Sequence, residues 1–407
     1  MKKFLSLILA FSLCLSFVGC GGAEAAGVGN ASGSVSAADS GAAASQAELL
    51  AAEAEAEKDV ETTVTVTLSD GAPRADGAGV AVAGDKVTVT SGGSYRVTGT
   101  LTNGQIVVNA PEETVVLALD GASVACENSA ALYVVAAKKV VLSLVSGSEN
   151  ALASTGEYVQ TDDNTVDAAL FSKDDLTIKG SGALAVSSET GHGIVSKDEL
   201  KIQSGTLTVT AAKKGLAAND LVEITGGETY VSGSTNSGNG AFDYAGAGTI
   251  TGGTVIAAGS SGMAQSLSSD TQGVALLTLS GTQSAGSAVT LKDANGALLA
   301  SFTPEKPYSS VVISAPGMES GGTYAVACGS ESRSITLEGF AYSEDGFSGF
   351  GGGKFGGMGS GFGGGRPEGD FDGGRPDGTP PSGFSGGKPS GTPPAGFPDG
   401  GSAVQSA

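Results

Sequence analysis

The 407-residue sequence has no tryptophan, a single histidine and only four cysteines. A lone histidine such as His192 is more typical of a turn than of a catalyst, because no second ligand or paired nucleophile accompanies it. No zinc cluster, phosphate-binding loop or nucleophile elbow is visible. These absences favour a protein that is not an enzyme.

Basic residues are scarce as well, with 21 Lys and Arg against 42 Asp and Glu and a formal net charge of −21. Nucleic-acid binding needs clustered Lys and Arg to displace counterions, so we exclude a nucleic-acid partner. An acidic surface suits solubility outside the cell and weak cation binding. A polysaccharide lyase needs a basic residue to abstract a proton, and no arginine lies in the regular repeats described below.

The first residues have the pattern of an export signal. Lys2 and Lys3 precede an apolar stretch that ends shortly before Cys20. The run Phe17-Val18-Gly19-Cys20 resembles a bacterial lipobox, with Phe17 in place of the usual Leu. We therefore predict a lipoprotein signal peptide over residues 1–19, lipidation of Cys20, and location on the extracellular face of the cell membrane through the lipid anchor only. The alternative is an ordinary signal peptide with a coincidental cysteine.

Composition divides the rest of the chain into four segments. Residues 20–59 are rich in Ala, Gly, Ser and Glu and are predicted to be a flexible linker. Residues 60–262 alternate Val and Thr between glycines and predict strands, whereas residues 263–340 have longer strands and predict a small β cap or appendage. Residues 341–407 are rich in Gly, Pro and Phe and predict a disordered tail.

Cys126 and Cys328 fall in different predicted segments. An oxidising compartment would permit a disulfide between them, and two buried thiols is the alternative that we prefer.

An internal repeat is the strongest signal in the sequence. Residues 172–178 recur at 196–202 and, less well kept, at 218–224. Offsets of about 24 and 22 residues without space for a helix are typical of a solenoid. We predict an all-β fold, a right-handed parallel β-helix of roughly eight coils, in which equivalent residues stack. The inward rows would be Leu170, Ile194 and Leu216; Leu176, Leu200 and Val222; Ile178, Ile202, Ile224 and Ile250; and Val186, Val209 and Val231.

Stacking would also align Asp174, Asp198 and Asp220 in a carboxylate row. Calcium prefers such oxygen ligands, so these three residues are candidate metal ligands. Lys173 and Lys197 are an alternative source of charge compensation, and capping of turns by the aspartates is a third interpretation.

Asp162 and Asp163 are further metal candidates in an insertion over residues 157–167, which would otherwise be a solvated acidic loop.

Aromatic residues that could stack on sugars are few. Tyr158, Tyr230 and Tyr244 are candidate carbohydrate-binding residues, although each could equally belong to the core or to an edge. Without tryptophan, a flat platform for crystalline cellulose is less well supported than binding of an acidic polysaccharide through bridging cations.

Four segments, at residues 99–106, 169–178, 191–200 and 308–314, resemble a bacterial carbohydrate-binding domain-containing lipoprotein family, formerly a domain of unknown function. The resemblance covers most of residues 85–330. It implies a pectate-lyase-like parallel β-helix that binds calcium and plant cell-wall polysaccharides, cellulose or acidic pectins, without established catalysis. Where members often carry Asp-Asp-Gly turns, this chain has Gly191-His192-Gly193 and Lys213-Lys214-Gly215.

The resulting hypothesis is a monomeric surface lipoprotein that binds extracellular polysaccharide with the help of calcium. A structural or adhesive surface solenoid is the second hypothesis, and a polysaccharide lyase is the third.

Overall fold

The computed structural model describes residues 64–343, which form 29 strands and no helix. No helix that could cross a membrane occurs in this part of the chain. The predicted signal peptide (1–19), the lipidation site Cys20 and the linker (20–59) lie outside the described residues, as does the predicted tail except for its first three residues. Those three, Ala341–Ser343, form the short strand β29.

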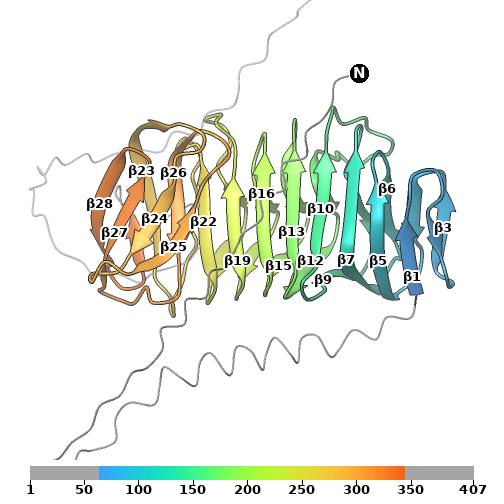
Figure 1. Ribbon diagram of the computed structural model, residues 1–407, viewed down its shortest axis with the longest axis horizontal. Coiled ribbons are helices and arrows are strands. Elements are labelled where there is room, and N and C mark those ends of the chain that lie inside the picture. Colours follow the sequence, from blue (N-terminus) through green and yellow to red (C-terminus); the bar gives the residue numbers. More distant parts are fainter. Residues whose placement is uncertain (1–63, 344–407) are drawn as a thin grey trace, which may run out of the picture. The chain divides into compact units, whose positions relative to one another are not determined.

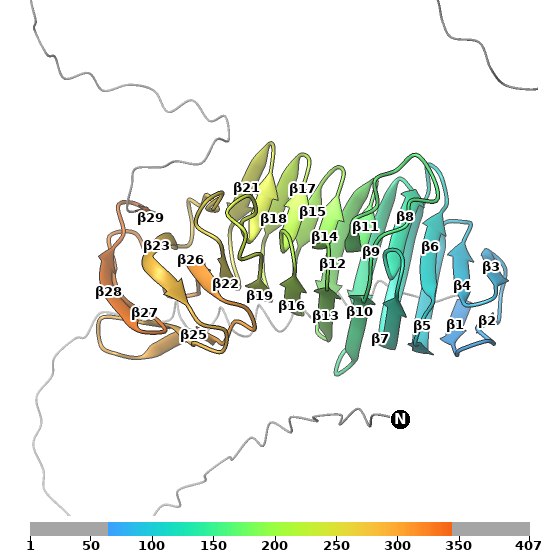
Figure 2. The same cartoon turned by 90° about the horizontal axis from the view of Figure 1, so that it is seen from above.

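One wall of the molecule is an eight-stranded sheet. Its strands are parallel from β4 to β20, and only the terminal hairpin of β3 and β4 is antiparallel. Figure 2 shows several of these strands side by side along the upper edge of the stack. In order they are β3 (Val80–Ala83), β4 (Lys86–Val89), β6 (Gln105–Asn109), β8 (Leu132–Ala136), β11 (Ala168–Ser172), β14 (His192–Ser196), β17 (Leu216–Ala218) and β20 (Phe242–Tyr244).

Two further parallel ladders form the other walls, and the long strands β5 (Gly93–Leu101) and β7 (Thr114–Cys126) contribute to both. One ladder has eight strands, as the roughly eight predicted coils require. They are β1 (Val64–Leu68), the first half of β5, the first half of β7, β9 (Lys139–Leu144), β12 (Asp175–Gly180), β15 (Leu200–Ile202), β18 (Leu221–Ile224) and β21 (Ala247–Ile250). The other ladder consists of the second half of β5, the second half of β7, β10 (Glu149–Ser154), β13 (Ala183–Ser188), β16 (Thr206–Ala211), β19 (Glu228–Ser232) and β22 (Thr254–Gly259).

The register of the ladders stacks equivalent residues of successive repeats. Ile178 pairs with Ile202, Ile202 with Ile224, and Ile224 with Ile250, and all four are fully buried. The three other predicted inward rows are formed in the same way. Since alternate residues of a strand face opposite sides, one apolar residue in two suffices to fill the interior. The predicted all-β fold with stacked parallel strands is confirmed.

Glycine recurs at one turn of the coil. Gly180, Gly205, Gly227 and Gly253 have φ values of 108°, 88°, 73° and 86°, in the region that residues with a side chain rarely adopt. A Cβ atom at Gly180 would also lie 2.2 Å from the carbonyl oxygen of Leu144 on the coil below. The repeated glycine therefore allows the chain to turn while neighbouring coils remain in contact.

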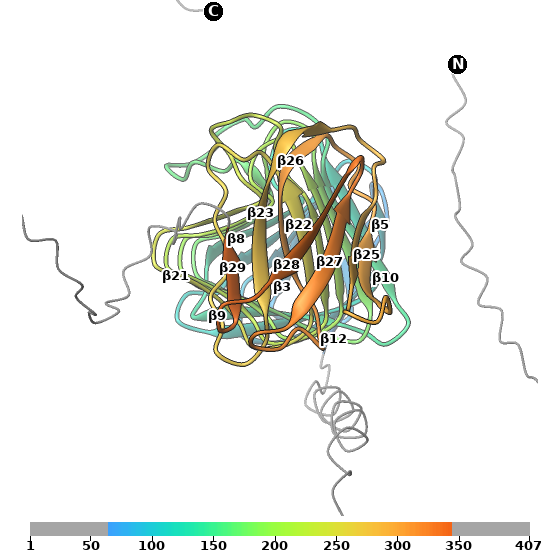
Figure 3. The same cartoon turned by 90° about the vertical axis from the view of Figure 1, so that its left-hand side faces the viewer.

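Antiparallel strands follow the last coil (Figure 1). Strand β26 (Tyr308–Ser314) pairs antiparallel with both β22 and β23 (Val274–Gln283), and β29 joins the outer edge of β23. A separate four-stranded antiparallel sheet lies across this end of the stack (Figure 3). Its strands, in spatial order, are β25 (Leu298–Phe302), β24 (Val289–Lys292), β27 (Thr323–Cys328) and β28 (Glu331–Thr336).

Both ends of the parallel stack are covered. At the first end, the short strand β2 (Arg74–Ala75) pairs antiparallel with β1. At the other end, the side-chain amide of Gln265 accepts a hydrogen bond from the N–H of Tyr244 at 2.9 Å and donates one to its carbonyl at 3.1 Å. Gln265 thus takes the place of a further strand beside β20.

Cys126 and Cys328 are both buried and unpaired. The prediction of two buried thiols is confirmed.

Candidate functional site

The outer face of the eight-stranded sheet carries one row of side chains in register, one from each coil. Tyr133 pairs with Phe171, Phe171 with Val195, and Val195 with Ala217. Ala217 pairs with Asp243, which ends the row on β20. The row is therefore aromatic over β8 and β11, small and apolar over β14 and β17, and charged at its end.

Charged and polar residues border this row on both sides. His192 of β14 and Lys214, just before β17, lie on one side. On the other side, Lys197 and Asn219 follow the paired residues Ser196 and Ala218. Their backbone N–H groups donate to the preceding coil, so Lys197 and Asn219 occupy equivalent positions.

A shallow pocket of about 140 Å³ lies over the small apolar part of the row. Val195 and Ala217 contribute apolar lining, and the remaining lining residues are mostly polar or charged. The pocket is lined by Asp167, His192, Val195, Ser196, Lys197, Lys214, Ala217, Ala218, Asn219 and Asp243.

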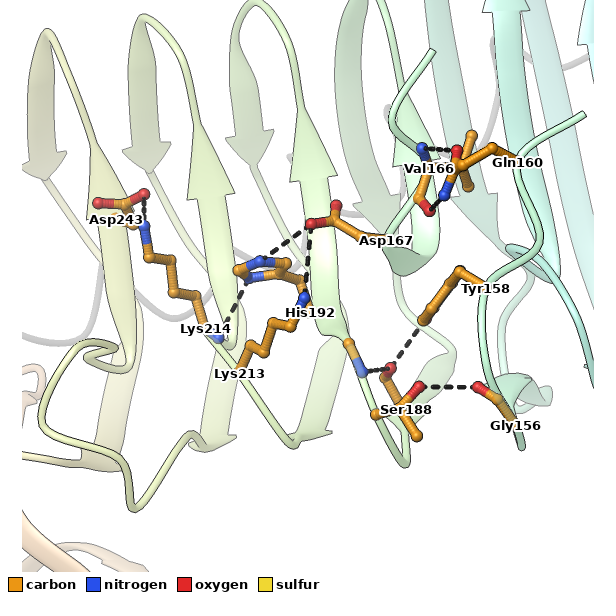
Figure 4. A network of polar contacts seen from close by, with 12 residues as sticks. Gly156, Tyr158, Gln160, Val166, Asp167, Ser188, His192, Lys213, Lys214 and Asp243 are labelled. Carbon is orange, nitrogen blue, oxygen red and sulfur yellow. Dashed lines mark hydrogen bonds and ion pairs between the residues drawn. The ribbon is translucent and has the colours of Figure 1, made fainter. Parts of the chain in front are cut away.

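Asp167 and His192 face each other at one edge of the pocket (Figure 4). The Oδ2 atom of Asp167 lies 3.3 Å from Nε2 of His192 and 3.8 Å from Nζ of Lys213. Burial raises the pKa of Asp167, but the hydrogen bond from His192 and the charges of Lys213 and Lys197 outweigh burial and hold it below its usual value. Asp167 is therefore a carboxylate at neutral pH.

Both nitrogens of the His192 ring have partners. Nδ1 accepts a hydrogen bond from the backbone N–H of Lys214 at 3.2 Å, so the proton of the neutral ring is on Nε2, facing Asp167. The side chain of Lys214 extends to the next coil, where Nζ forms an ion pair with Asp243. One chain of contacts thus joins four successive coils (Figure 4).

Glycine on either side of His192 permits this stacking. A Cβ atom at Gly191 would lie 2.3 Å from the carbonyl oxygen of Asp167, and one at Gly193 would lie 2.3 Å from Cγ1 of Val209. Such distances are too short for any side chain, so the Gly191-His192-Gly193 motif lets the coils approach closely enough for the Asp167–His192 contact.

The aromatic part of the row lies beneath the insertion at residues 157–167. The hydroxyl of Tyr133 donates to Oδ2 of Asp162 at 2.7 Å and accepts from Nδ2 of Asn164 at 2.6 Å. Val166 is buried in the same cluster as Tyr133 and Phe171. The rings of Tyr133 and Phe171 meet edge to face, with centroids 5.8 Å apart.

The structure does align the predicted carboxylate row. The pKa of Asp198 is raised by burial and by the neighbouring carboxylates, including those of Asp174 and Asp220. Oδ2 of Asp174 accepts the N–H of Ala137 at 2.9 Å, however, and Lys201 lies 2.7 Å from Glu199. Lys201 thus compensates the charge of Glu199, beside the row. Of the two lysines considered as an alternative to calcium, Lys197 places its Nζ over the ring of Phe171.

Within residues 64–343, no group of three or more His, Cys, Asp or Glu side chains could hold a metal ion. Asp162 is engaged with Tyr133, and Asp163 is exposed. The metal role of these two residues, and of Asp174, Asp198 and Asp220, stays a prediction without a coordinating group in the described structure.

The three predicted tyrosines lie apart from one another. The hydroxyl of Tyr158 hydrogen-bonds with Oγ of Ser188 at 2.8 Å, near the pocket but not lining it. Tyr230 stacks on Phe302 of the cap, with ring centroids 5.1 Å apart. Tyr244 is buried and donates to the carbonyl of Ser266. Their role in carbohydrate binding stays a prediction.

Sequence reasoning missed Asp167, Lys213, Lys214 and Asp243 as site residues, and it interpreted His192 as a turn residue. The available signal was the register. His192 and Lys214 each precede an inward residue, Ile194 or Leu216, by two positions and must therefore lie on neighbouring coils.

Comparisons with known proteins give three results. A family model described as carbohydrate-binding domain-containing protein matches residues 83–355. A carbohydrate-binding domain-containing protein of Acetivibrio thermocellus is 38% identical over 136 residues, which cover 33% of this chain and 48% of the relative. A solved structure described as the polysaccharide lyase-like protein from C. thermocellum, in a gadolinium derivative, is 34% identical and covers 46% of this chain and 80% of that chain, with a TM-score of 0.40. The alignment thus spans about half the length of the curated relative.

Proposed function

The chain belongs to the carbohydrate-binding domain-containing protein family, as its motifs predicted, and we propose that it binds polysaccharide along the outer face of its eight-stranded sheet. The observation that carries this proposal is the pocket over Val195 and Ala217, bordered on both sides by charged side chains. A sugar ring has apolar C–H faces and polar edges. An apolar strip between rows of hydrogen-bonding groups matches both features.

In this proposal the polysaccharide runs across the coils, parallel to the axis of the stack. Coils repeat about every 4.8 Å, so successive sugar units meet equivalent positions of successive coils. Each unit places a ring face on the apolar row, while its hydroxyl or carboxylate groups contact the border residues, chiefly Lys197, Lys214 and Asn219.

Lysines around the pocket favour an acidic polysaccharide. Lys197, Lys213 and Lys214 lie in or beside the pocket, against the carboxylates of Asp167 and Asp243. In a chain with a net charge of −21, this is a local concentration of positive charge that attracts uronate groups. The binding mode uses lysines directly. Calcium assistance is a separate proposal, tested by repeating the titrations below with and without calcium.

Binding rather than catalysis fits the geometry of His192. A general base needs a nitrogen available to the substrate proton, and both nitrogens of His192 are engaged by Asp167 and Lys214. We therefore propose that His192 positions Asp167 and Lys214. Formation of unsaturated uronates from polygalacturonate, seen by ultraviolet absorbance, would instead support a lyase.

The proposal is tested by calorimetric titration of the protein with oligogalacturonides and cello-oligosaccharides. We expect Lys214→Ala to weaken binding of oligogalacturonides about tenfold or more, because a hydrogen bond to a charged group is worth about 1.5–3 kcal/mol. Lys201→Ala is the matched control, since Lys201 pairs with Glu199 on another wall of the stack. Equal affinity of the two variants, or no binding to either sugar series, would contradict the proposal. A protein partner captured by cross-linking without any glycan affinity would support the structural or adhesive alternative.

We further propose that the coils are right-handed, as nearly all parallel strand connections are, that the protein is a monomer, and that it is anchored to the cell surface by lipid. A crystal structure and light scattering test the first two of these points.

A further inference from the structure

The binding surface proposed above continues beneath the insertion. The row that supplies Val195 and Ala217 to the pocket runs on in register to Phe171 and Tyr133, which are buried. Lys197 extends from the pocket to the ring of Phe171, with Nζ 5.3 Å from its centroid. Val195 and Ala217, which are 5% and 8% exposed, line the pocket, whereas Phe171 and Tyr133, which are 1% and 4% exposed, do not.

Residues 160–166, called the cover loop below, contact the aromatic part of the row: Asp162 and Asn164 bind the hydroxyl of Tyr133, and Val166 is buried in one cluster with Tyr133 and Phe171. The loop is closed upon itself, because the side-chain amide of Gln160 exchanges two hydrogen bonds of 2.8 Å with the backbone of Val166. A third bond joins Oδ1 of Asp162 to the N–H of Asn164. These bonds lie within the loop, so they can persist when the loop moves as a unit.

Few contacts attach the cover loop to the strands below it. Among residues 157–167, all of which the structure describes, only Val166 is buried. The polar attachment is the hydroxyl of Tyr133, which hydrogen-bonds with Asp162 and Asn164.

Both ends of the loop are anchored more firmly. The N–H of Val159 donates to the carbonyl of Asn128 at 2.8 Å, and Asp167 contacts His192.

We propose that the cover loop is a displaceable lid over an aromatic extension of the carbohydrate-binding groove. A short oligosaccharide occupies the pocket alone. A longer chain lifts the loop about its anchored ends and places further sugar rings on Phe171 and Tyr133. The extension provides the aromatic stacking surface that sugar binding commonly uses. This inference rests on the proposed function, and it adds a dependence of affinity on ligand length.

The test compares trigalacturonide and octagalacturonide on three full-length proteins: wild type, Asp162→Ala and Glu157→Ala. Both variants remove one negative charge from the insertion, but only Asp162 binds Tyr133, and Glu157 is exposed. Loss of this hydrogen bond raises the population of the open loop. We therefore expect Asp162→Ala to increase the preference for the octasaccharide over the trisaccharide about fivefold relative to wild type. The Glu157→Ala variant should retain the wild-type preference. Equal preferences in all three proteins would overturn the lid.

Hydrogen–deuterium exchange on the wild-type protein gives a second readout that needs no variant. Octagalacturonide should accelerate amide exchange in residues 160–166 and slow it in β14 and β17, whereas trigalacturonide should only slow it in β14 and β17. Slower exchange in the loop with the octasaccharide would mean that the loop closes on the ligand, and this would refute displacement. Absence of binding by either oligosaccharide would refute the proposed function itself, which distinguishes the two failures.

Discussion

Ile202→Ala tests whether the stacked interior stabilises the solenoid. Ile202 is fully buried, with an exposure of 0%, and it pairs with Ile178 and Ile224 on the adjoining coils. Truncation of such a residue leaves a cavity, which could close only if the two flanking coils moved inward. The expected loss of unfolding free energy is about 2–5 kcal/mol.

For a folded unit of this size, each kcal/mol lowers the melting temperature by about 2–4 °C. We therefore expect Ile202→Ala to melt roughly 5–15 °C below the wild type, as followed by circular dichroism of the strands. Thr208→Ala is the control, because Thr208 lies on the outer side of the neighbouring strand β16 and is only partly buried. A surface change of this kind alters stability by about 0.5 kcal/mol or less. Similar melting temperatures for the two variants would refute the inward stacking of this row.

Three further predictions concern separate parts of the chain. Gly193→Ala should destabilise the protein by about 1–3 kcal/mol in a denaturant titration and weaken oligogalacturonide binding, because the new Cβ would meet Val209 and displace His192. The control is Gly281→Ala, where a Cβ meets nothing within 4 Å, and this variant should show neither effect. Glu331→Gln should lower the melting temperature at neutral pH. Burial raises the pKa of Glu331, but hydrogen bonds from Ser280, Gly281 and Arg333 lower it to about 2, below its ordinary value of 4.5. The ionised carboxylate therefore stabilises the folded protein fully above pH 4.5, and this stabilisation is lost as the pH falls toward 2. The melting-temperature difference between wild type and Glu331→Gln should vanish over that interval, and a constant difference would contradict this assignment. Cys20→Ala should abolish incorporation of a palmitate analogue in cells and release the protein from the membrane fraction; continued labelling would exclude Cys20 as the lipidation site.

The inward rows could be predicted because two periodicities coincide. Period-two alternation within each strand and a repeat of about two dozen residues together fix which side chains face inward and which stack. Ile178, Ile202 and Ile224 satisfy both, and the structure pairs them. The antiparallel pairing of β26 with both β22 and β23 has no such repeat behind it, so its register could not be derived from the sequence.

The pocket was harder to predict because its residues do not repeat. Asp167 lies at the end of an insertion, directly before Ala168, which pairs with His192 in the sheet and so brings the carboxylate to the imidazole ring. Lys214 stands where relatives were expected to carry an acidic turn, so it was interpreted as a departure from the family pattern. Asp174, Asp198 and Asp220 did repeat, but within residues 64–343 they belong to no group of three or more side chains that could hold a metal ion. In this chain, the repeated residues predicted the stacked strands, and residues that differ between repeats form the charged part of the pocket.

The side-chain amide of Gln265 has a consequence for assembly. It satisfies both the N–H and the carbonyl of Tyr244 on the last strand of the eight-stranded sheet. A strand from a neighbouring molecule could extend that sheet only by first displacing this amide. Gln265 thus prevents edge-to-edge pairing at Tyr244, where a leucine of similar size would leave both backbone groups of this strand open to a second molecule.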